Sequence, residues 1–266
     1  MAASEQTVEE SDGFTVDAFH RGDFHLVQPS RRGHRAGTDA MMLAAAVPGS
    51  FRGRLADLGA GAGAAGLAVA SRCPDANVVL IENAPEMADF ARRSLALPEN
   101  TGLASRGSVL EADVQLADGD RRAAGLADFS FDWAIMNPPF NRPGDRASPD
   151  ALRRYAHVMN DHNVFDSWLR TAGWIVKPGG GVAVIARPES LQPILAGMHP
   201  YFGAQEVKAL HPRSDKAATR IIVRAIRGSN RPLSILPPLF LHAEGSDRFT
   251  AEADDINNGR ASLFGD

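Results

Sequence analysis

The decapeptide DLGAGAGAAG, residues 57–66, decides the fold that this sequence predicts. A short apolar run at 54–58 extends into it, and it leads into a helix-forming stretch at 67–72. Glycines at such a junction let the backbone turn sharply, and they leave bare amides that a ligand can approach at a helix N-terminus. The decapeptide therefore predicts a strand, a ligand-binding turn and a helix.

The rest of the chain alternates apolar, β-branched runs with helix-forming stretches. Strands are predicted at 54–58, 77–81, 108–111, 131–136, 181–186, 206–210 and 219–226. Helices are predicted at 39–47 (with Thr38 as N-cap), 67–72, 85–97, 149–160, 163–175 and 188–198, and a turn at 177–180. Such alternation gives a parallel sheet covered on both faces. Because no helix joins the last two strands, we expect a Rossmann-like α/β fold with seven strands, mostly parallel, and an antiparallel last strand.

The glycine turn fits two cofactors. Its glycines from 61 to 66 match the G-x-G-x-x-G fingerprint of dinucleotide-binding proteins, and Glu82 lies about 20 residues on, where that fingerprint has its ribose acid. Asp57, followed by alternating glycines, also matches the first motif of S-adenosylmethionine (SAM) methyltransferases, in which the acid reaches the amino-acid end of the cofactor and no phosphate is bound. A tight turn that binds no ligand is the third interpretation.

Polar side chains at the ends of successive predicted strands help to choose between these cofactors. Asp57, Glu82, Asp113 and Asn137 each fall at or just past such an end, where ligands of doubly wound sheets bind. Glu82 is placed to accept from a ribose diol, and Asp113 from an adenine amine. Taken singly, each acid is more often a helix cap. Together they suit a sulfonium cation and would repel a pyrophosphate, which favours SAM over NAD.

The stretch FDWAIMNPPF, residues 131–140, ends a buried strand with an amide, two prolines and an aromatic ring. The prolines remove two backbone donors and stiffen the loop. An exocyclic amine of a base is a poor nucleophile, and a site can help by accepting its two N–H groups. Asn137 Oδ1 and the Pro138 carbonyl can do so. Phe140 can stack on the base ring, a contact of ~1–3 kcal/mol. The alternative is a rigid loop without a ligand.

Together, DLGAGAG, Glu82, Asp113 and NPPF resemble the amino-methyltransferases that act on planar nitrogens of adenine, cytosine, guanine or glutamine amide. The stretches FHLVQPSRRGHRAGTDAMMLAAAV, KPGGGVAVIARPESLQPIL, IIVRAIRG and PPLFLHAEG are similar to the bacterial valine-tRNA adenine-N6 methyltransferase family. This resemblance covers roughly residues 20–255. The chain departs from the family after NPPF, where YAHVMN (155–160) stands in place of an Ala-Arg-His-Glu-like segment.

The resemblance implies a SAM-dependent methyltransferase of class I that acts on an exocyclic nitrogen, most simply adenine N6 of a tRNA. It implies cofactor contacts at Thr38, Asp57, Gly59, Gly61, Gly63, Glu82, Asp113 and Asn137. It implies a target-amine site at Asn137, Pro138 and Phe140, and no metal. A small-molecule or O-methyltransferase on the same fold, or an NAD(P)-binding protein, are the alternatives.

A basic stretch at 205–231 is the candidate nucleic-acid contact. It holds seven Lys or Arg against two acids, a local charge of about +5 in a chain whose net charge is −4. The side chains expected to meet RNA are Lys208, Arg213, Lys216 and Arg220. The solvated face of an edge strand explains the same charges equally well. His157 and His162 flank Asp161, but a solvated helix explains them better than a metal site.

Composition supports one large α/β domain in a reducing compartment. The chain has 266 residues, 44% of them hydrophobic, and a single cysteine, Cys73. The N-terminus lacks the features of a signal peptide, and no apolar run reaches the ~20 residues of a membrane span. We expect a cytoplasmic protein. Its divisions are predicted as a disordered acidic tail (1–12), a lead-in packed on the catalytic domain (13–50), the methyltransferase domain (51–227) and a C-terminal appendage (228–266).

Overall fold

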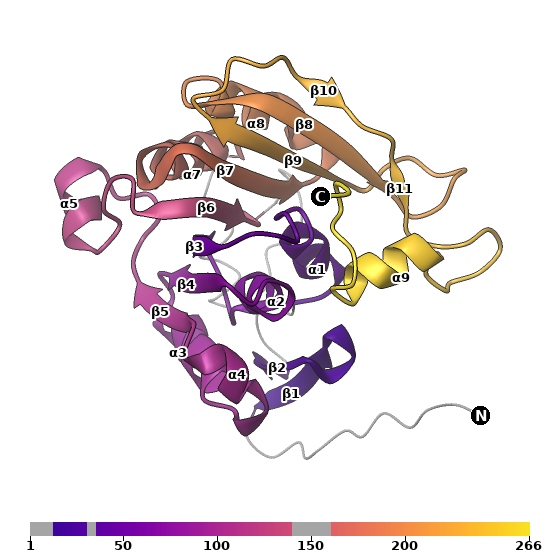
Figure 1. The fold of residues 1–266 in the computed structure, drawn as a ribbon, viewed down its shortest axis with the longest axis horizontal. Helices are drawn as coiled ribbons and strands as arrows, with labels where there is room; N and C mark the ends of the chain where they lie inside the picture. Colours follow the sequence, from indigo (N-terminus) through magenta and orange to yellow (C-terminus); the bar gives the residue numbers. More distant parts are fainter. Residues whose placement is uncertain (1–12, 31–35, 140–160) are drawn as a thin grey trace.

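The computed structural model of this chain describes residues 13–30, 36–139 and 161–266 (Figure 1). The predicted tail 1–12 and the predicted helix 149–160 lie outside the described residues. Within the described part, no helix combines the length and apolar character needed to cross a membrane.

A central β-sheet confirms the predicted fold class. Its seven main strands are β3 (Gly53–Leu58), β4 (Ala76–Glu82), β5 (Gly107–Glu111), β6 (Phe131–Met136), β7 (Val176–Ala186), β8 (Phe202–His211) and β9 (Arg220–Arg227). The strand order is β10-β8-β9-β7-β6-β3-β4-β5, and only β9 among the main strands runs antiparallel to its neighbours. The two-residue strands β10 (Ser234–Ile235) and β11 (Leu239–Phe240), which the sequence did not reveal, pair with β8.

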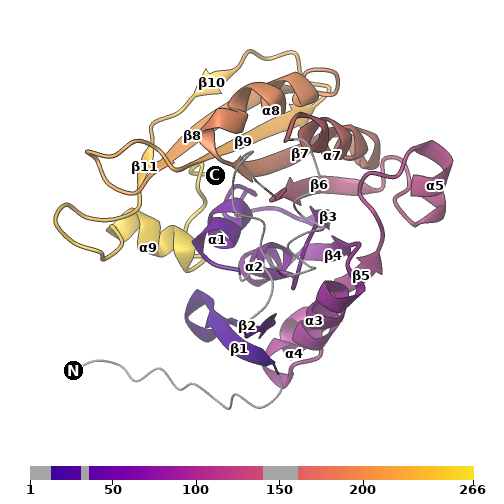
Figure 2. The same ribbon diagram turned by 180° about the vertical axis from the view of Figure 1, so that it is seen from behind.

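Helices cover both faces of the sheet, as Figures 1 and 2 show. One face packs on α1 (Thr38–Ala44), α2 (Ala64–Arg72) and α3 (Pro85–Leu95), and the other on α7 (Asp161–Ile175) and α8 (Leu191–Met198). Successive strand side chains point to opposite faces. Leu55 and Ile135 accordingly join the first core, and Leu58 and Ala134 the second. Burial on both sides explains the continuous apolar runs in these strands.

The remaining helical elements among the described residues are short. They are η1 (His20–Gly22), η2 (Pro98–Asn100), α4 (Thr101–Ala104), α5 (Asp118–Ala123), η3 (Pro188–Ser190) and α9 (Ala251–Asn257).

An antiparallel hairpin precedes the sheet and packs against α3. Its strands are β1 (Phe14–Phe19) and β2 (Phe24–Pro29). On its other edge β2 bonds to side chains: Val27 N–H donates to Ser94 Oγ at 2.9 Å, and His25 N–H donates to Asn100 Oδ1 at 2.9 Å. These side chains supply acceptors that a neighbouring strand would otherwise provide.

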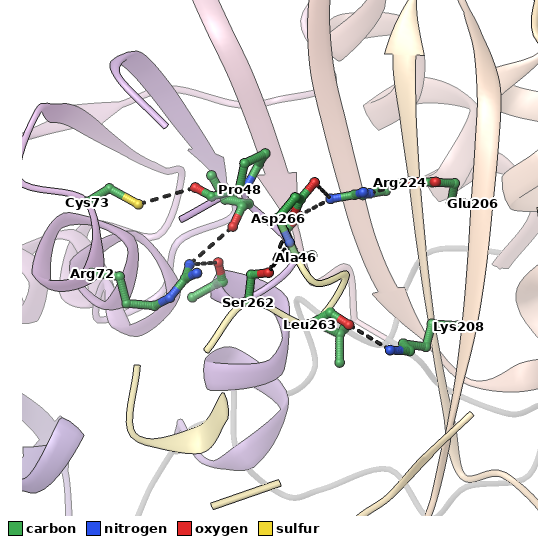
Figure 3. A network of polar contacts seen from close by, with 12 residues as sticks. Ala46, Pro48, Arg72, Cys73, Glu206, Lys208, Arg224, Ser262, Leu263 and Asp266 are labelled. Atoms are coloured by element: carbon green, nitrogen blue, oxygen red, sulfur yellow. Dashed lines mark hydrogen bonds and ion pairs between the residues drawn. The ribbon is translucent and has the colours of Figure 1, made fainter. Parts of the chain in front are cut away.

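The last residues of the chain lie between α1 and the β8–β9 pair, as Figure 3 shows. Leu263 N–H donates to the Ala45 carbonyl at 2.7 Å, while Lys208 Nζ donates to the Leu263 carbonyl at 2.7 Å. Arg224 forms an ion pair with Asp266 at 2.8 Å, and its guanidinium lies over the Phe264 ring. This segment therefore closes the first core beside α1.

Two local predictions need correction. α1 begins at Thr38 and ends at Ala44, and its N-cap is Gly37, so Thr38 is the first helical residue instead of the cap. The predicted turn at 177–180 lies within β7, as an irregular part of that strand. There, the two-residue step from Phe131 to Trp133 on β6 is paired with the five-residue step from Val176 to Gly181 on β7. A bulge thus absorbs the proline and glycines without ending the strand.

Candidate functional site

The carboxyl ends of three adjacent strands bring the predicted site residues to one edge of the sheet. β3 lies between β4 and β6, and Leu58 at its end is paired with Ile81 on one side and Met136 on the other. Glu82 directly follows Ile81 in the sequence, and Asn137 directly follows Met136. Glu82 and Asn137 therefore flank the glycine turn, one on each side of it.

The glycine turn is tight and has no room for a side chain at its first glycine. Gly59 has φ +71°, and a Cβ built there would lie 2.3 Å from the ring of Trp168 on α7. The amides of Gly59 and Ala60 both donate to the Ile81 carbonyl at 2.9 Å. Gly63 caps α2 in the left-handed region, at φ +96°. The local sequence thus folds as predicted, a sharp passage from strand to helix.

Glu82 connects the glycine turn to the end of β4. It is 8% exposed, and its Oε2 accepts the Gly61 N–H at 2.8 Å while Oε1 accepts the Ala84 N–H at 2.9 Å. Ala84 is the N-cap residue of α3, so the helix-capping interpretation of this acid has a structural basis. A carboxylate has about four acceptor sites. The two that remain are compatible with the predicted ribose contact.

Asp57 is a buried carboxyl at the foot of the same turn. It is 2% exposed, and its Oδ2 accepts the Gly66 N–H at 2.8 Å. Desolvation raises its pKa from 3.8 to about 7, against the opposing effect of the Gly66 hydrogen bond. A cationic group bound nearby would favour the ionised form and lower this pKa. The environment thus suits the ammonium end of an amino-acid ligand.

Asp113 and Thr38 lie farther out on the same edge. Asp113 follows β5, is half-buried, and accepts the Gln115 N–H at 2.8 Å with Oδ1, which shapes the loop. Thr38 is half-buried in the first turn of α1, and its neighbour Asp39 forms an ion pair with Arg220 at 2.7 Å. Their predicted cofactor contacts stay predictions.

The Asn-Pro-Pro segment leaves β6 beside the turn. Asn137 is half-buried and Pro138 is buried. Within the described ranges, no hydrogen bond involves the Asn137 side chain, so its amide is available to a ligand. Phe140, the third member of the predicted target-amine site, lies outside the described residues, as does His157.

Trp168, on the predicted helix 163–175, contacts the glycine turn although the sequence did not single it out. It is buried at 9% exposure, and its ring lies against Gly59, as the near contact with a Cβ there shows. Its indole Nε1 has no hydrogen-bond partner in the part of the chain described. No local pattern signals this contact, because the helix and the turn are more than 100 residues apart in sequence.

Most cations of the basic stretch 205–231 serve the fold. Lys208 Nζ donates a hydrogen bond to the Leu263 carbonyl. Arg224 is only 12% exposed in its side chain and pairs with both Glu206 and Asp266. Arg227 donates to the Gly173 carbonyl at 2.6 Å. The stretch is therefore not a continuous basic face, and the nucleic-acid interpretation cannot apply to all of it.

The edge-strand explanation of these charges is also wrong. β9 lies inside the sheet, between β7 and β8, and β8 carries β10 and β11 on its outer side. Two further cations of the stretch lie in the loop between β8 and β9. Lys216 is 60% exposed and pairs with its neighbour Asp215. Arg213 is 32% exposed, pairs with Asp247, which is 98% exposed, and donates to the Ser246 carbonyl at 3.2 Å.

Comparison with known proteins identifies relatives across most of the chain. The model of the methyltransferase small domain family matches residues 32–211. The tRNA1(Val) (adenine(37)-N6)-methyltransferase of Aeromonas hydrophila is 26% identical over 225 residues, which cover 83% of this chain and 86% of that protein. The ribosomal RNA small subunit methyltransferase C of Pasteurella multocida is 29% identical over 72% of this chain and 47% of its own length.

Solved structures give a similar picture. The crystal structure of a predicted O-methyltransferase from Agrobacterium tumefaciens is 44% identical, has a TM-score of 0.74, and covers 85% of this chain and 98% of its own. A 16S rRNA N2 methyltransferase of T. thermophilus, solved with AdoMet and guanosine, has a TM-score of 0.52 at 20% identity, over 80% of this chain and 50% of its own. The second similarity is one of fold alone.

Proposed function

The chain belongs to the methyltransferase small domain family, with SAM as its cofactor, and we propose that it methylates an exocyclic nitrogen of a nucleic-acid base, adenine N6 of a tRNA. Membership of this family supports the SAM interpretation of the glycine turn over the dinucleotide interpretation. The relatives named for tRNA adenine-N6 and ribosomal RNA methylation support the nucleic-acid substrate. An RNA substrate of this kind also supports the expected cytoplasmic location.

The observation that carries the proposal is the position of Asn137 at the end of β6. Its register partner strand β3 ends at Leu58, so the Asn137 amide lies beside the turn that belongs to the methyl donor. Its side chain has no hydrogen bond in the described part of the chain. An uncommitted acceptor at this point can receive an N–H of the target amine.

The chemistry requires little beyond positioning. The lone pair of an exocyclic amine is delocalised into the ring, and acceptance of its two N–H groups by Asn137 Oδ1 and the Pro138 carbonyl draws it toward the methyl carbon. The new N–C bond would form as the S–C bond breaks, S-adenosylhomocysteine would leave, and the methylated amine would then lose one proton to water. Positive charge develops on nitrogen, so both hydrogen bonds strengthen in the transition state.

The cofactor side of the proposal uses the same edge of the sheet. Asp57 and the glycine turn would receive the amino-acid end of SAM, Glu82 the ribose hydroxyls and Asp113 the adenine amine. Glu82 is held by two backbone N–H groups, which supports a fixed orientation toward a ribose. Thr38 would complete this shell from α1. No step requires a metal ion, and this too is part of the proposal.

For the RNA, we propose that Arg213 and Lys216 contact phosphates and that Lys208 does not. Asp247 is 98% exposed, and surface pairs contribute ~0–1 kcal/mol, so a phosphate can replace this carboxylate at little cost while the second bond of Arg213, to the Ser246 carbonyl at 3.2 Å, stays in place. Lys208 donates to a backbone carbonyl that would lose its partner.

Methylation of an oxygen is the second candidate, because the Agrobacterium relative is named a predicted O-methyltransferase. A hydroxyl nucleophile must lose its proton to a base before or during transfer. An amine can release its proton after the N–C bond has formed. The two candidates thus differ in when the proton must leave, and they also differ in the atom that receives the methyl group.

The test is a methylation assay with purified protein, isotope-labelled SAM, and tRNA and ribosomal RNA from a strain that lacks the gene, followed by nucleoside mass spectrometry. We expect label in N6-methyladenosine from tRNA. Label in a ribose 2′-O-methyl group would support the second candidate. An absence of label from both RNA classes, with the parent protein shown to bind SAM, would overturn the nucleic-acid assignment.

A further inference from the structure

A buried side-chain amide on the hairpin, that of Gln28, fixes the segment that precedes α1. Gln28 on β2 is 1% exposed. Its Oε1 accepts the Ala36 N–H at 2.7 Å, and its Nε2 donates to Asp17 Oδ2 at 2.7 Å. The hairpin thus determines where the chain begins its approach to Thr38, two residues after Ala36.

From the other side the same segment is held by Arg220. Arg220 Nε donates to Asp39 Oδ2 at 2.7 Å across 181 residues of sequence, and its Nη1 donates to the Thr219 carbonyl at 2.8 Å. Asp39 lies in the first turn of α1, next to Thr38. Both charged side chains are about 30% exposed, so water screens this pair less than a fully exposed one.

The location of Arg220 links this pair to the site. Ile221, the next residue, is paired with Ala186, which is the last residue of β7. Arg220 therefore stands at the carboxyl edge of the sheet, on the strand that follows the exposed loop of Lys216. Its guanidinium is already engaged by a carboxylate and by a backbone carbonyl, which argues against a free phosphate-binding group.

We propose that Arg220 is a positioning residue for the cofactor, which acts through Asp39 to hold Thr38 in place, and that it is not an RNA contact. The inference rests on the proposed function, because the Thr38 contact with SAM belongs to that proposal. It corrects the assignment of Arg220 that the basic stretch suggested. Loss of either charge should let the first turn of α1 shift, and SAM affinity should fall while RNA affinity does not.

The experiment measures the SAM dissociation constant by calorimetry without RNA, for the parent, Arg220→Ala, Asp39→Asn, the double variant and the exchanged pair Asp39→Arg/Arg220→Asp. We expect each single change to weaken SAM binding by about tenfold, since a displaced contact residue is costly to a preorganised site. The double variant should be no worse than the singles, and the exchanged pair should recover part of the loss. Arg231→Ala, an exposed arginine beyond the opposite end of β9, is the matched control.

Steady-state kinetics separate positioning from a general loss of structure. We expect KM for SAM to rise in Arg220→Ala while KM for RNA and its salt dependence stay at the parental values. Asp39→Asn, nearly isosteric, covers the case in which Arg220→Ala does not fold. Parental SAM affinity in both single variants overturns the inference, and so does a flattened RNA salt dependence in Arg220→Ala. A parent protein that fails to bind SAM would instead overturn the proposed function.

Discussion

Glu82 Oε2 accepts the backbone N–H of Gly61 at 2.8 Å, so the last residue of β4 fixes the middle of the glycine turn. The other oxygen accepts the Ala84 N–H at the start of α3. One carboxylate therefore joins the two loops across which a SAM molecule would lie. Because the side chain is 8% exposed and accepts two backbone hydrogen bonds, its orientation is set before any ligand arrives.

We expect Glu82→Ala to weaken SAM binding by about 10- to 150-fold, the equivalent of ~1.5–3 kcal/mol for hydrogen bonds to a charged group. Calorimetry with purified protein measures this directly. Glu111→Ala is the matched control, because Glu111 is paired with Glu82 on the neighbouring strand but is exposed and bonds to Arg92. SAM affinity within twofold of the parent in Glu82→Ala would contradict the ribose assignment.

The pKa of Asp57, raised to about 7 by burial, makes stability depend on pH. The folded protein binds this proton more tightly than the unfolded chain, so the stabilisation present below pH 4 is lost as pH rises through 7. In Asp57→Asn this part of the dependence should vanish. The parent should lose on the order of 2 kcal/mol more than the variant between pH 5 and 8, at about 1.4 kcal/mol per pKa unit.

Urea unfolding of both ligand-free proteins at the two pH values checks the Asp57 prediction. Comparison of the two proteins cancels the effect of other titrating groups, including His20, whose pKa burial lowers to about 4. Parallel stability curves for parent and variant would show that Asp57 is ionised in the folded protein throughout this range.

Lys216 and Lys208 should differ in their effect on RNA binding. Lys216 is exposed beside Asp215, and we expect Lys216→Ala to reduce the slope of log affinity against log salt by about 1. Lys208 holds a backbone carbonyl, and Lys208→Ala should leave that slope unchanged but lower the free energy of unfolding by ~1 kcal/mol. Filter binding across a salt series and thermal melting measure the two effects. The opposite assignment of effects would restore Lys208 as a phosphate contact.

Local patterns predicted β6 to the residue, because an apolar run meets Asn137 and two prolines that end it. The strand ends that carry Asp57 and Glu82 followed from the same reasoning. Contacts between distant segments did not, since no local signal reports them. The Arg220–Asp39 pair joins residues 181 apart, and the basic stretch alone does not reveal that its arginine has a carboxylate partner.

The N-terminal hairpin and the wall of the glycine turn show the same limit. On one edge, β2 uses the side chains of Ser94 and Asn100 as hydrogen-bond acceptors. Its own sequence does not report these distant partners. Trp168 reads as a core residue of an apolar helix, and only the packing of α7 on the turn reveals that it contacts Gly59. Propensity and periodicity describe single elements, whereas these contacts depend on how elements meet.

The final prediction concerns Asn137. If its Oδ1 accepts an N–H of the target amine, the bond strengthens as positive charge develops on nitrogen, and the side chain acts on the rate more than on binding. We expect Asn137→Ala to lower kcat by ~10²–10³. The SAM dissociation constant should stay within a few-fold of the parent, because the proposed partner of the amide is the target amine and not the cofactor. Single-turnover methylation with saturating RNA measures the chemical step.

A control is needed because a loop change can also disturb the strand before it. β6 is buried and paired on both sides, so Asn137→Ala should melt within a few degrees of the parent. Phe140→Ala serves as the contrasting variant, since loss of a stacking ring should raise KM for RNA more than it lowers kcat. If Asn137→Ala methylates at the parental rate, the Asn-Pro-Pro segment is only a rigid end to β6, and the nitrogen-directed mechanism loses its main support.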